Sequence, residues 1–447
     1  MTLNVAVVGS GPAGFYTADA LLKSDDPPVA VDLLDRLPTP WGLVRLGVAP
    51  DHENIKAVSR AFEKTAARPN FRFFGNVEVG STVSHEELLS LYDAVVYTVG
   101  AQTDRRLGIP GEDLPGSWPA TAFVAWYNGH PDFQDLEFDL DCERVVVIGN
   151  GNVAIDCARM LALTAAELAP TDTIDDAADA IAASPVREIL MLGRRGPVQA
   201  AFTPPELKEL GELQGAEPVV DPHDLELDAA SRAELEADRE RAKRNFDLLE
   251  EYAARAPEGK PRQIVLRFLV SPVAILGDER VEAVEIVRNE LVEEGGRIVA
   301  RPTGRTETIP CGLVLRSVGY QGVALPGVPF DERRGVIPNA AGRVEGAERT
   351  YAAGWIKRGP SGVIGTNKKD STETVELLLA DARDGKLARA DSTQTLEALL
   401  AAKEAAYVEY AGWQAIDAAE RAAGEPRGRP RVKLTGWEAL LQAGRPR

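Results

Sequence analysis

The chain has 447 residues, of which 44% are hydrophobic and 27% are charged, and its net charge is −19. This charge argues against nucleic acid as the main partner, because phosphate binding needs clustered lysine and arginine. The three cysteines form no CxxC motif, so neither a disulfide framework nor a metal site is indicated. No apolar stretch approaches the length of a membrane span, and we expect a cytoplasmic, monomeric protein.

The first elements predict a dinucleotide-binding turn. An apolar strand at residues 5–8 runs into a glycine-rich turn and a helix, and the next strand, 29–34, ends at Asp35. Backbone N–H groups of such a turn approach a pyrophosphate, and the acid accepts hydrogen bonds from ribose hydroxyls. The alternative is a glycine turn with an incidental surface acid. The turn and the start of the helix contain Gly9, Gly11, Pro12, Ala13 and Gly14.

A proline-rich loop, 38–50, separates this unit from a helix marked by Ile55, Val58 and Phe62. His52 lies in this region, but a lone histidine is more often structural than catalytic. A buried strand over 92–99 then ends at a glycine.

The pattern restarts at the strand 145–148, which is followed by Gly149, Gly151 and Ala154. This variant of the fingerprint opens a helix on which Cys157 is expected to be a core residue. No acid ends the next strand, 189–192; Arg194 and Arg195 follow it instead. Paired guanidinium groups match the 2′-phosphate of NADPH, although a solvated arginine pair is the alternative.

In the rest of this second unit we expect a long connection over 162–184 and a charged helix over 231–256. Three strands are expected at 264–270, 281–287 and 313–318. Glu206 opens a helix after two prolines, where an acid also favours the helix dipole.

A third glycine-rich segment, 359–367, opens a helix after a strand that ends near Trp355. Its N–H groups suit the negative charge of a reduced flavin, although a flexible turn is an equal alternative. We therefore predict an α/β protein with two Rossmann-like dinucleotide-binding domains, the NADP domain being inserted into the FAD domain. The predicted ranges are 1–103 and 323–447 for the FAD-binding domain and 104–322 for the NADP-binding domain.

With these motifs assembled, the chain resembles the adrenodoxin reductase family of NADPH:ferredoxin reductases, especially its bacterial members. The matching stretches span nearly the whole chain: VVGSGPAGFYTA, PTPWGLVRLGVAPDH, FFGNVEVG, VVIGNGNVAIDCARML, GRRGPVQAAFT, LVLRSVGY, GWIKRGPSGVIGTN and GRPRVK.

The resemblance implies two cofactors, FAD and NADP(H), and a ferredoxin-type iron–sulfur partner. For FAD it implies the glycine turn, with the further contacts Asp35, Leu43, Val79, Trp355, Val363 and Ile364. For the nucleotide it implies Asn150, Gly151, Asn152, Val153, Arg194, Arg195, Glu206 and Gly362. His52 matches a family histidine near the isoalloxazine ring. His52 and Glu206 are the candidate catalytic residues. Basic residues dock the partner in this family, and Lys23, Lys208, Arg241 and Arg244 match them.

The expected activity is hydride transfer from NADPH to the flavin, followed by single-electron transfer to a ferredoxin. Two alternatives remain open: an FAD-dependent NADPH monooxygenase, and a non-catalytic protein that binds flavin and nucleotide. A disulfide reductase is disfavoured because no paired redox cysteines exist.

Overall fold

The computed structural model describes residues 2–238, 240–362 and 364–445. The chain forms two compact units. Unit 1 comprises Met1–Thr103, Asn128–Gln134 and Gly319–Arg447, and unit 2 comprises Asp104–Tyr127 and Asp135–Val318. The segment Asn128–Gln134, which lies inside the range predicted for the NADP-binding domain, packs with unit 1. Among the described residues, no helix is long and apolar enough to cross a membrane.

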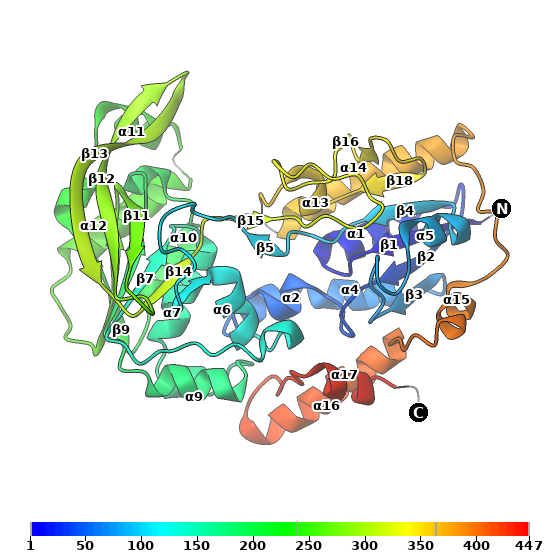
Figure 1. Cartoon of the computed structure of the whole chain (residues 1–447), viewed down its shortest axis with the longest axis horizontal. Helices are drawn as coiled ribbons and strands as arrows, with labels where there is room; N and C mark the ends of the chain where they lie inside the picture. The colour runs from blue at the N-terminus through cyan, green and yellow to red at the C-terminus, as the bar shows by residue number, and fades with distance from the viewer. Residues whose placement is uncertain (1, 239, 363, 446–447) are drawn as a thin grey trace. The chain divides into compact units, whose positions relative to one another are not determined.

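Unit 1 is built on a seven-stranded sheet in the order β16-β17-β18-β4-β1-β2-β3. Pairing is parallel from β18 to β3 and antiparallel at the β16 and β17 edge. The strands are β1 (Leu3–Val8), β2 (Val29–Leu34), β3 (Phe71–Phe74), β4 (Ala94–Tyr97), β16 (Asn339–Ala340), β17 (Arg343–Val344) and β18 (Thr350–Ala352). The last three strands come from the C-terminal part of the chain, which therefore completes the first sheet, as Figure 1 shows.

Both faces of this sheet are covered, because successive side chains of a strand point to opposite faces. On β1, Val5 and Val7 belong to one hydrophobic cluster, whereas Ala6 and Val8 belong to the other. The helices of unit 1 are α1 (Pro12–Leu21), α2 (Leu43–Leu46), α3 (Glu53–Lys56), α4 (Ser59–Ala66), α5 (His85–Leu91), α13 (Trp355–Arg358), α14 (Ile364–Arg383), α15 (Leu396–Ala402), α16 (Tyr410–Gly424) and α17 (Trp437–Ala443). Short 3₁₀ turns lie at η1 (Pro131–Phe133) and η4 (Glu425–Arg427).

Unit 2 contains a six-stranded parallel sheet in the order β6-β14-β7-β8-β10-β9. Its strands are β6 (Ser117–Pro119), β7 (Arg144–Ile148), β8 (Glu188–Leu192), β9 (Ala216–Val220), β10 (Arg262–Arg267) and β14 (Leu313–Arg316). Its helices are α6 (Ala120–Tyr127), α7 (Asn152–Ala162), α8 (Ala165–Leu168), α9 (Asp175–Ala183), α10 (Pro204–Leu210), α11 (Ala229–Ala237) and α12 (Ala242–Ala254), with 3₁₀ turns at η2 (Pro197–Gln199) and η3 (Pro222–Leu225). The predicted α/β class is confirmed, since each unit is built on a parallel or largely parallel sheet, and Cys157 is fully buried as expected.

An antiparallel sheet of β11 (Val270–Leu276), β12 (Ala283–Glu294) and β13 (Arg297–Pro310) packs on one face of the parallel sheet. The single strand predicted at 264–270 is wrong: β10 and β11 belong to different sheets, and Leu269 between them has a positive φ of 57°. The strand predicted at 281–287 is longer than expected and forms a hairpin with β13. A separate two-stranded sheet joins β5 (Thr103–Asp104) and β15 (Tyr320–Gln321).

Two predicted helices are interrupted. The helix with Ile55, Val58 and Phe62 is divided into α3 and α4, and α3 buries no residue. The charged stretch 231–256 is divided at Asp238, whose Oδ1 accepts a hydrogen bond from the Arg241 backbone N–H at 3.0 Å. Such local side-chain bonds compete with a continuous helix.

Candidate cofactor-binding sites

The turn after β1 brings its backbone very close to α1. A Cβ added to Gly14 would lie 1.9 Å from the Gly9 carbonyl oxygen, so this position requires glycine. A Cβ on Gly11 would meet nothing within 4 Å, and no side chain caps the N-terminus of α1. The turn therefore leaves open space in front of a helix N-terminus, which favours an anionic group.

Asp35, directly after β2, holds this turn in place through hydrogen bonds. Its Oδ2 accepts hydrogen bonds from the Ser10 N–H at 2.7 Å and the Ser10 hydroxyl at 2.6 Å, and its Oδ1 accepts one from the Leu37 N–H at 2.9 Å. Burial raises the pKa of Asp35, and the hydrogen bonds from Ser10 and Leu37 oppose that rise. A carboxylate offers about four acceptor positions, so Oδ1 keeps the capacity to accept a ribose hydroxyl. Ser10 is a site residue that was not predicted, although it lies inside the fingerprint.

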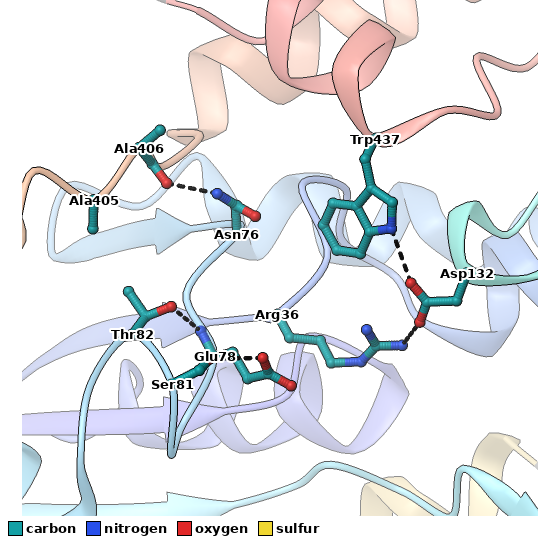
Figure 2. A pocket seen from close by; sticks show the side chains of 9 residues that line it. All are labelled: Arg36, Asn76, Glu78, Ser81, Thr82, Asp132, Ala405, Ala406 and Trp437. Atoms are coloured by element: carbon teal, nitrogen blue, oxygen red, sulfur yellow. Dashed lines mark hydrogen bonds and ion pairs between the residues drawn. The ribbon is translucent and has the colours of Figure 1, made fainter.

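A polar cavity of about 500 Å³ lies next to this end of β2. Figure 2 shows Arg36 and Trp437 both directed at the Asp132 carboxylate, which accepts hydrogen bonds from the Arg36 guanidinium and, at 2.9 Å, from the Trp437 indole N–H. The lining residues are Arg36, Asn76, Glu78, Ser81, Thr82, Asp132, Ala405, Ala406 and Trp437. Arg36 directly follows Asp35 and Glu78 directly precedes Val79, so the cavity adjoins two of the predicted FAD contacts.

Of the two predicted FAD-lining residues, Val79 is buried and Leu43, at the start of α2, is 38% exposed. The cavity's Asp132 and Trp437 carry no motif signal, because their roles depend on distant segments of unit 1 meeting one another.

The helix that the third glycine-rich segment opens, α14, packs against α1 within unit 1. The Ser371 hydroxyl on α14 donates a hydrogen bond to the Ala13 carbonyl at 3.1 Å. Arg358 holds the loop before α14 by donating to the Ser361 carbonyl at 2.8 Å and to the Asn367 Oδ1 at 2.7 Å. Val363 lies outside the described residues, whereas Gly362 and Ile364 flank it at the start of α14.

Trp355 is the first residue of α13 and only partly exposed. Within the described part of the chain, its indole N–H is buried without a hydrogen-bond acceptor. A buried donor of this kind costs free energy unless a ligand or water satisfies it. The atom therefore fits a site that holds a polar ring.

The turn after β7 in unit 2 resembles the turn after β1, with one crowded and one open glycine position. A Cβ on Gly149 would lie 2.2 Å from the Ser317 carbonyl oxygen, whereas a Cβ on Gly151 would meet nothing within 4 Å. The Asn150 carbonyl accepts hydrogen bonds from the N–H groups of Ala201 and Phe202, at 3.0 and 3.1 Å. Val153 is partly buried in the first turn of α7.

Arg194 and Arg195 follow β8, as predicted. Arg194 is exposed and Arg195 is partly exposed. Their backbone is held in place, since the Arg194 carbonyl accepts from Asn289 Nδ2 at 2.9 Å and the Arg195 carbonyl accepts from the Leu269 N–H at 3.0 Å. The pair therefore presents two cations from a well-held backbone at the carboxyl end of the sheet, where ligands of such folds bind.

The two candidate catalytic residues lie in different units, His52 in unit 1 and Glu206 in unit 2. His52 is partly exposed at the N-cap position of α3, and its side chain does not cap that helix. Glu206 is 9% exposed, in the first turn of α10, where Pro204 and Pro205 begin the helix. Both prolines are accommodated at the first helical positions, where no backbone N–H is needed.

Most of the basic residues that match docking positions are paired with acids. Lys23 contacts Asp19 at 2.5 Å, Lys208 contacts Glu212 at 2.7 Å and Arg241 contacts Asp238 at 3.3 Å. Arg244 is exposed.

Comparison with known proteins extends these observations. The family of pyridine nucleotide-disulphide oxidoreductases matches residues 3–191. The chain is 51% identical over 451 residues to NADPH-ferredoxin reductase FprA of Mycobacterium tuberculosis, with 98% of each chain covered. It is 42% identical to the mitochondrial NADPH:adrenodoxin oxidoreductase of Arabidopsis thaliana, over 99% of this chain and 95% of the relative. Among solved structures, Mycobacterium tuberculosis FprA in complex with NADPH matches with a TM-score of 0.94 and 50% identity, over 99% of this chain and 100% of that one.

Proposed function

The chain belongs to the adrenodoxin reductase family of NADPH-ferredoxin reductases, and we propose that it carries electrons from NADPH through a bound FAD to a ferredoxin-type iron–sulfur protein. The observation that carries this proposal is the contrast between the two nucleotide turns. Each turn has open space at a helix N-terminus, but Asp35 follows the first and an arginine pair follows the second. Two different dinucleotides are therefore expected, one in each unit.

FAD is assigned to unit 1. The pyrophosphate would lie over Gly11 at the start of α1, and Asp35 would accept from the adenosine ribose. The cavity beside Arg36 and Glu78 adjoins that ribose position and would receive the adenine end. The orphaned indole N–H of Trp355 and the N-terminus of α14 would face the flavin end, where a helix N-terminus favours negative charge.

NADPH is assigned to unit 2. Its pyrophosphate would lie over Gly151 at the start of α7, flanked by Asn150, Asn152 and Val153. Its 2′-phosphate would be held by Arg194 and Arg195, whose guanidinium forks match phosphate oxygens. Gly362 remains the proposed nicotinamide contact.

When bound, FAD supplies the chemistry that turns one two-electron transfer into two single-electron transfers. The residues of the chain bind and orient the two cofactors and control charge around them. His52 and Glu206 are proposed to hold protons and ordered water near the reacting rings. Replacing either with a neutral isostere should slow flavin reduction in stopped-flow measurements without emptying the FAD site.

The test of function is cytochrome c reduction by the purified protein with NADPH, with and without an added ferredoxin. We expect the yellow protein to release FAD on acid precipitation and to reduce cytochrome c much faster when ferredoxin is present. A monooxygenase would instead form an oxygenated product in proportion to NADPH consumed. A non-catalytic nucleotide-binding protein would show no NADPH-dependent flavin bleaching. A monomeric state and a cytoplasmic location remain predictions.

A further inference from the structure

A third guanidinium group lies beside the arginine pair of unit 2. Arg241 precedes α12, and its Nη1 donates a hydrogen bond to the Ala200 carbonyl at 3.0 Å. The Nη2 of Arg195 donates to the Gln199 carbonyl at 3.4 Å. These two carbonyls belong to consecutive residues at the end of η2. The same short stretch of backbone therefore brings both guanidinium groups together, although Arg241 is distant in the sequence.

The cluster of Arg194, Arg195 and Arg241 carries more positive charge than the nearby acidic side chains neutralise. Asp238 contacts the Arg241 Nε at 3.3 Å, and Glu234 is engaged by Gln199 Nε2 at 2.8 Å. Burial lowers the pKa of Arg195, the cations Arg194 and Arg241 lower it further, and Glu234 opposes them. Three cations that repel one another at one site are stabilised when an anion binds among them.

Arg241 also has a donor group left for a ligand. Within the described residues, its Nε and Nη1 have acceptors, whereas its Nη2 has none. The side chain is 42% exposed, so it remains accessible from solvent. It precedes the N-terminus of the 13-residue helix α12, which has no side-chain cap and adds partial positive charge.

We propose that Arg241 is a third ligand of the NADPH 2′-phosphate, and hence a determinant of nucleotide choice rather than of ferredoxin docking. This inference rests on the proposed assignment of NADPH to unit 2. A phosphate monoester carries about −1.5 to −2 charges near neutral pH and three strong acceptor oxygens, so it can accept hydrogen bonds from more donors than the arginine pair supplies. A third guanidinium at the same backbone stretch supplies a further cation and a third fork of N–H donors.

The test compares binding of 2′,5′-ADP and ADP to the full-length holoprotein by titration calorimetry. Arg241→Gln should raise the Kd for 2′,5′-ADP roughly 5- to 20-fold and change the Kd for ADP by less than about twofold, after allowance for solvent screening. Arg244→Gln is the matched control, because Arg244 lies in the first turn of α12, three residues after Arg241, is exposed and is changed by the same charge. Its affinities for both nucleotides should equal those of the wild type.

A second variant separates charge from local folding. Arg241→Lys keeps the cation but loses the fork, so it should recover part of the 2′,5′-ADP affinity. An Arg241→Gln protein that loses affinity for both nucleotides equally would reveal a structural role and overturn the proposal. An unchanged Kd for 2′,5′-ADP, together with a raised KM for ferredoxin, would return Arg241 to the docking surface.

Failure of this inference differs from failure of the proposed function. A wild-type protein that does not prefer 2′,5′-ADP over ADP would remove the 2′-phosphate site altogether. A wild-type preference that survives in Arg241→Gln would leave that site with Arg194 and Arg195 and reject only the third ligand.

Discussion

The Asn152 side-chain oxygen accepts a hydrogen bond from the Thr203 backbone N–H at 2.9 Å. This bond joins the start of α7, where the nucleotide pyrophosphate is proposed to lie, to the N-cap of α10, which carries Glu206. Asn152 is therefore proposed to act in two ways: it would line the nucleotide site, and its hydrogen bond to Thr203 holds the start of the helix that carries Glu206.

Asn152→Ala should weaken nucleotide binding, because the Thr203 N–H would lose its acceptor at a cost of about 1–2 kcal/mol. We expect the Kd for NADPH to rise roughly 5- to 30-fold while FAD content stays unchanged. Thr203→Ala is the control, since the donor is a backbone group that this variant retains and the Thr203 side chain does not cap α10. Equal losses in the two variants would contradict this account.

The two open glycine positions predict a reciprocal result. Alanine at Gly11 or Gly151 meets no protein atom within 4 Å, so each protein should fold, while the added methyl group occupies the space proposed for a pyrophosphate. Gly11→Ala should lose FAD but retain binding of 2′,5′-ADP. Gly151→Ala should retain FAD but bind NADPH at least about tenfold more weakly. Flavin absorbance and calorimetry measure the two effects, and loss of FAD in Gly151→Ala would mean that the cofactor assignments are exchanged.

The arginine pair predicts nucleotide preference. Charge-assisted hydrogen bonds to a 2′-phosphate contribute about 1.5–3 kcal/mol each, which after solvent screening should favour NADPH over NADH by on the order of 10² to 10⁴ in kcat/KM. Arg195→Ala should remove part of this ratio and the double alanine variant most of it, with NADH use nearly constant. Arg187→Ala, an exposed change just before β8, is the control. A wild-type ratio near one would place the phosphate elsewhere.

A buried ion pair in unit 1 predicts pH-dependent stability. Arg45 contacts both Glu420 oxygens, at 2.8 and 2.6 Å, and the two side chains are 3% and 0% exposed. Burial raises the pKa of Glu420, but Arg45 and Arg431 outweigh that effect and lower it below its ordinary value of 4.5. The stabilisation is therefore present above that value and is lost as pH falls through the lower folded-state pKa.

Glu420→Gln should cost about 3–5 kcal/mol at neutral pH, because it leaves Arg45 buried without its countercharge. The difference from the wild type should shrink as pH falls from 4.5 through the lower folded-state pKa, because the wild type then also loses its carboxylate charge. Urea unfolding at neutral pH and at a series of acidic pH values measures this. Glu373→Gln is the control, since its pair with Lys369 is exposed and 3.8 Å long, and it should change stability by less than about 1 kcal/mol.

Local patterns in the sequence sufficed for the two nucleotide turns, because glycine spacing and the flanking strands are fixed by neighbouring residues. They also located Arg194 and Arg195, which follow a strand whose boundaries are clear from its apolar run. The family resemblance was needed for Leu43, Val79 and Trp355, whose types and spacing indicate no particular chemistry.

Long-range pairing is what local patterns could not supply. Asp132 contacts Arg36 and Trp437 across large separations in sequence, and no motif marks it. The break between β10 and β11 depends on the backbone of Leu269, a residue type that rarely adopts positive φ. The antiparallel sheet was also not predicted, because a strand predicted from its own residues does not indicate which other strand it pairs with.

The sheet of unit 1 also imposes an order on biosynthesis. β4 ends at Tyr97, but its neighbour β18 begins only at Thr350, after all of unit 2 has been made. On the ribosome, the N-terminal strands must wait with an unpaired edge at β4, while unit 2 already has every strand of its own parallel sheet. The segment made first therefore keeps an unpaired strand edge for longest, and a stalled or truncated product would expose the apolar edge of β4 to aggregation.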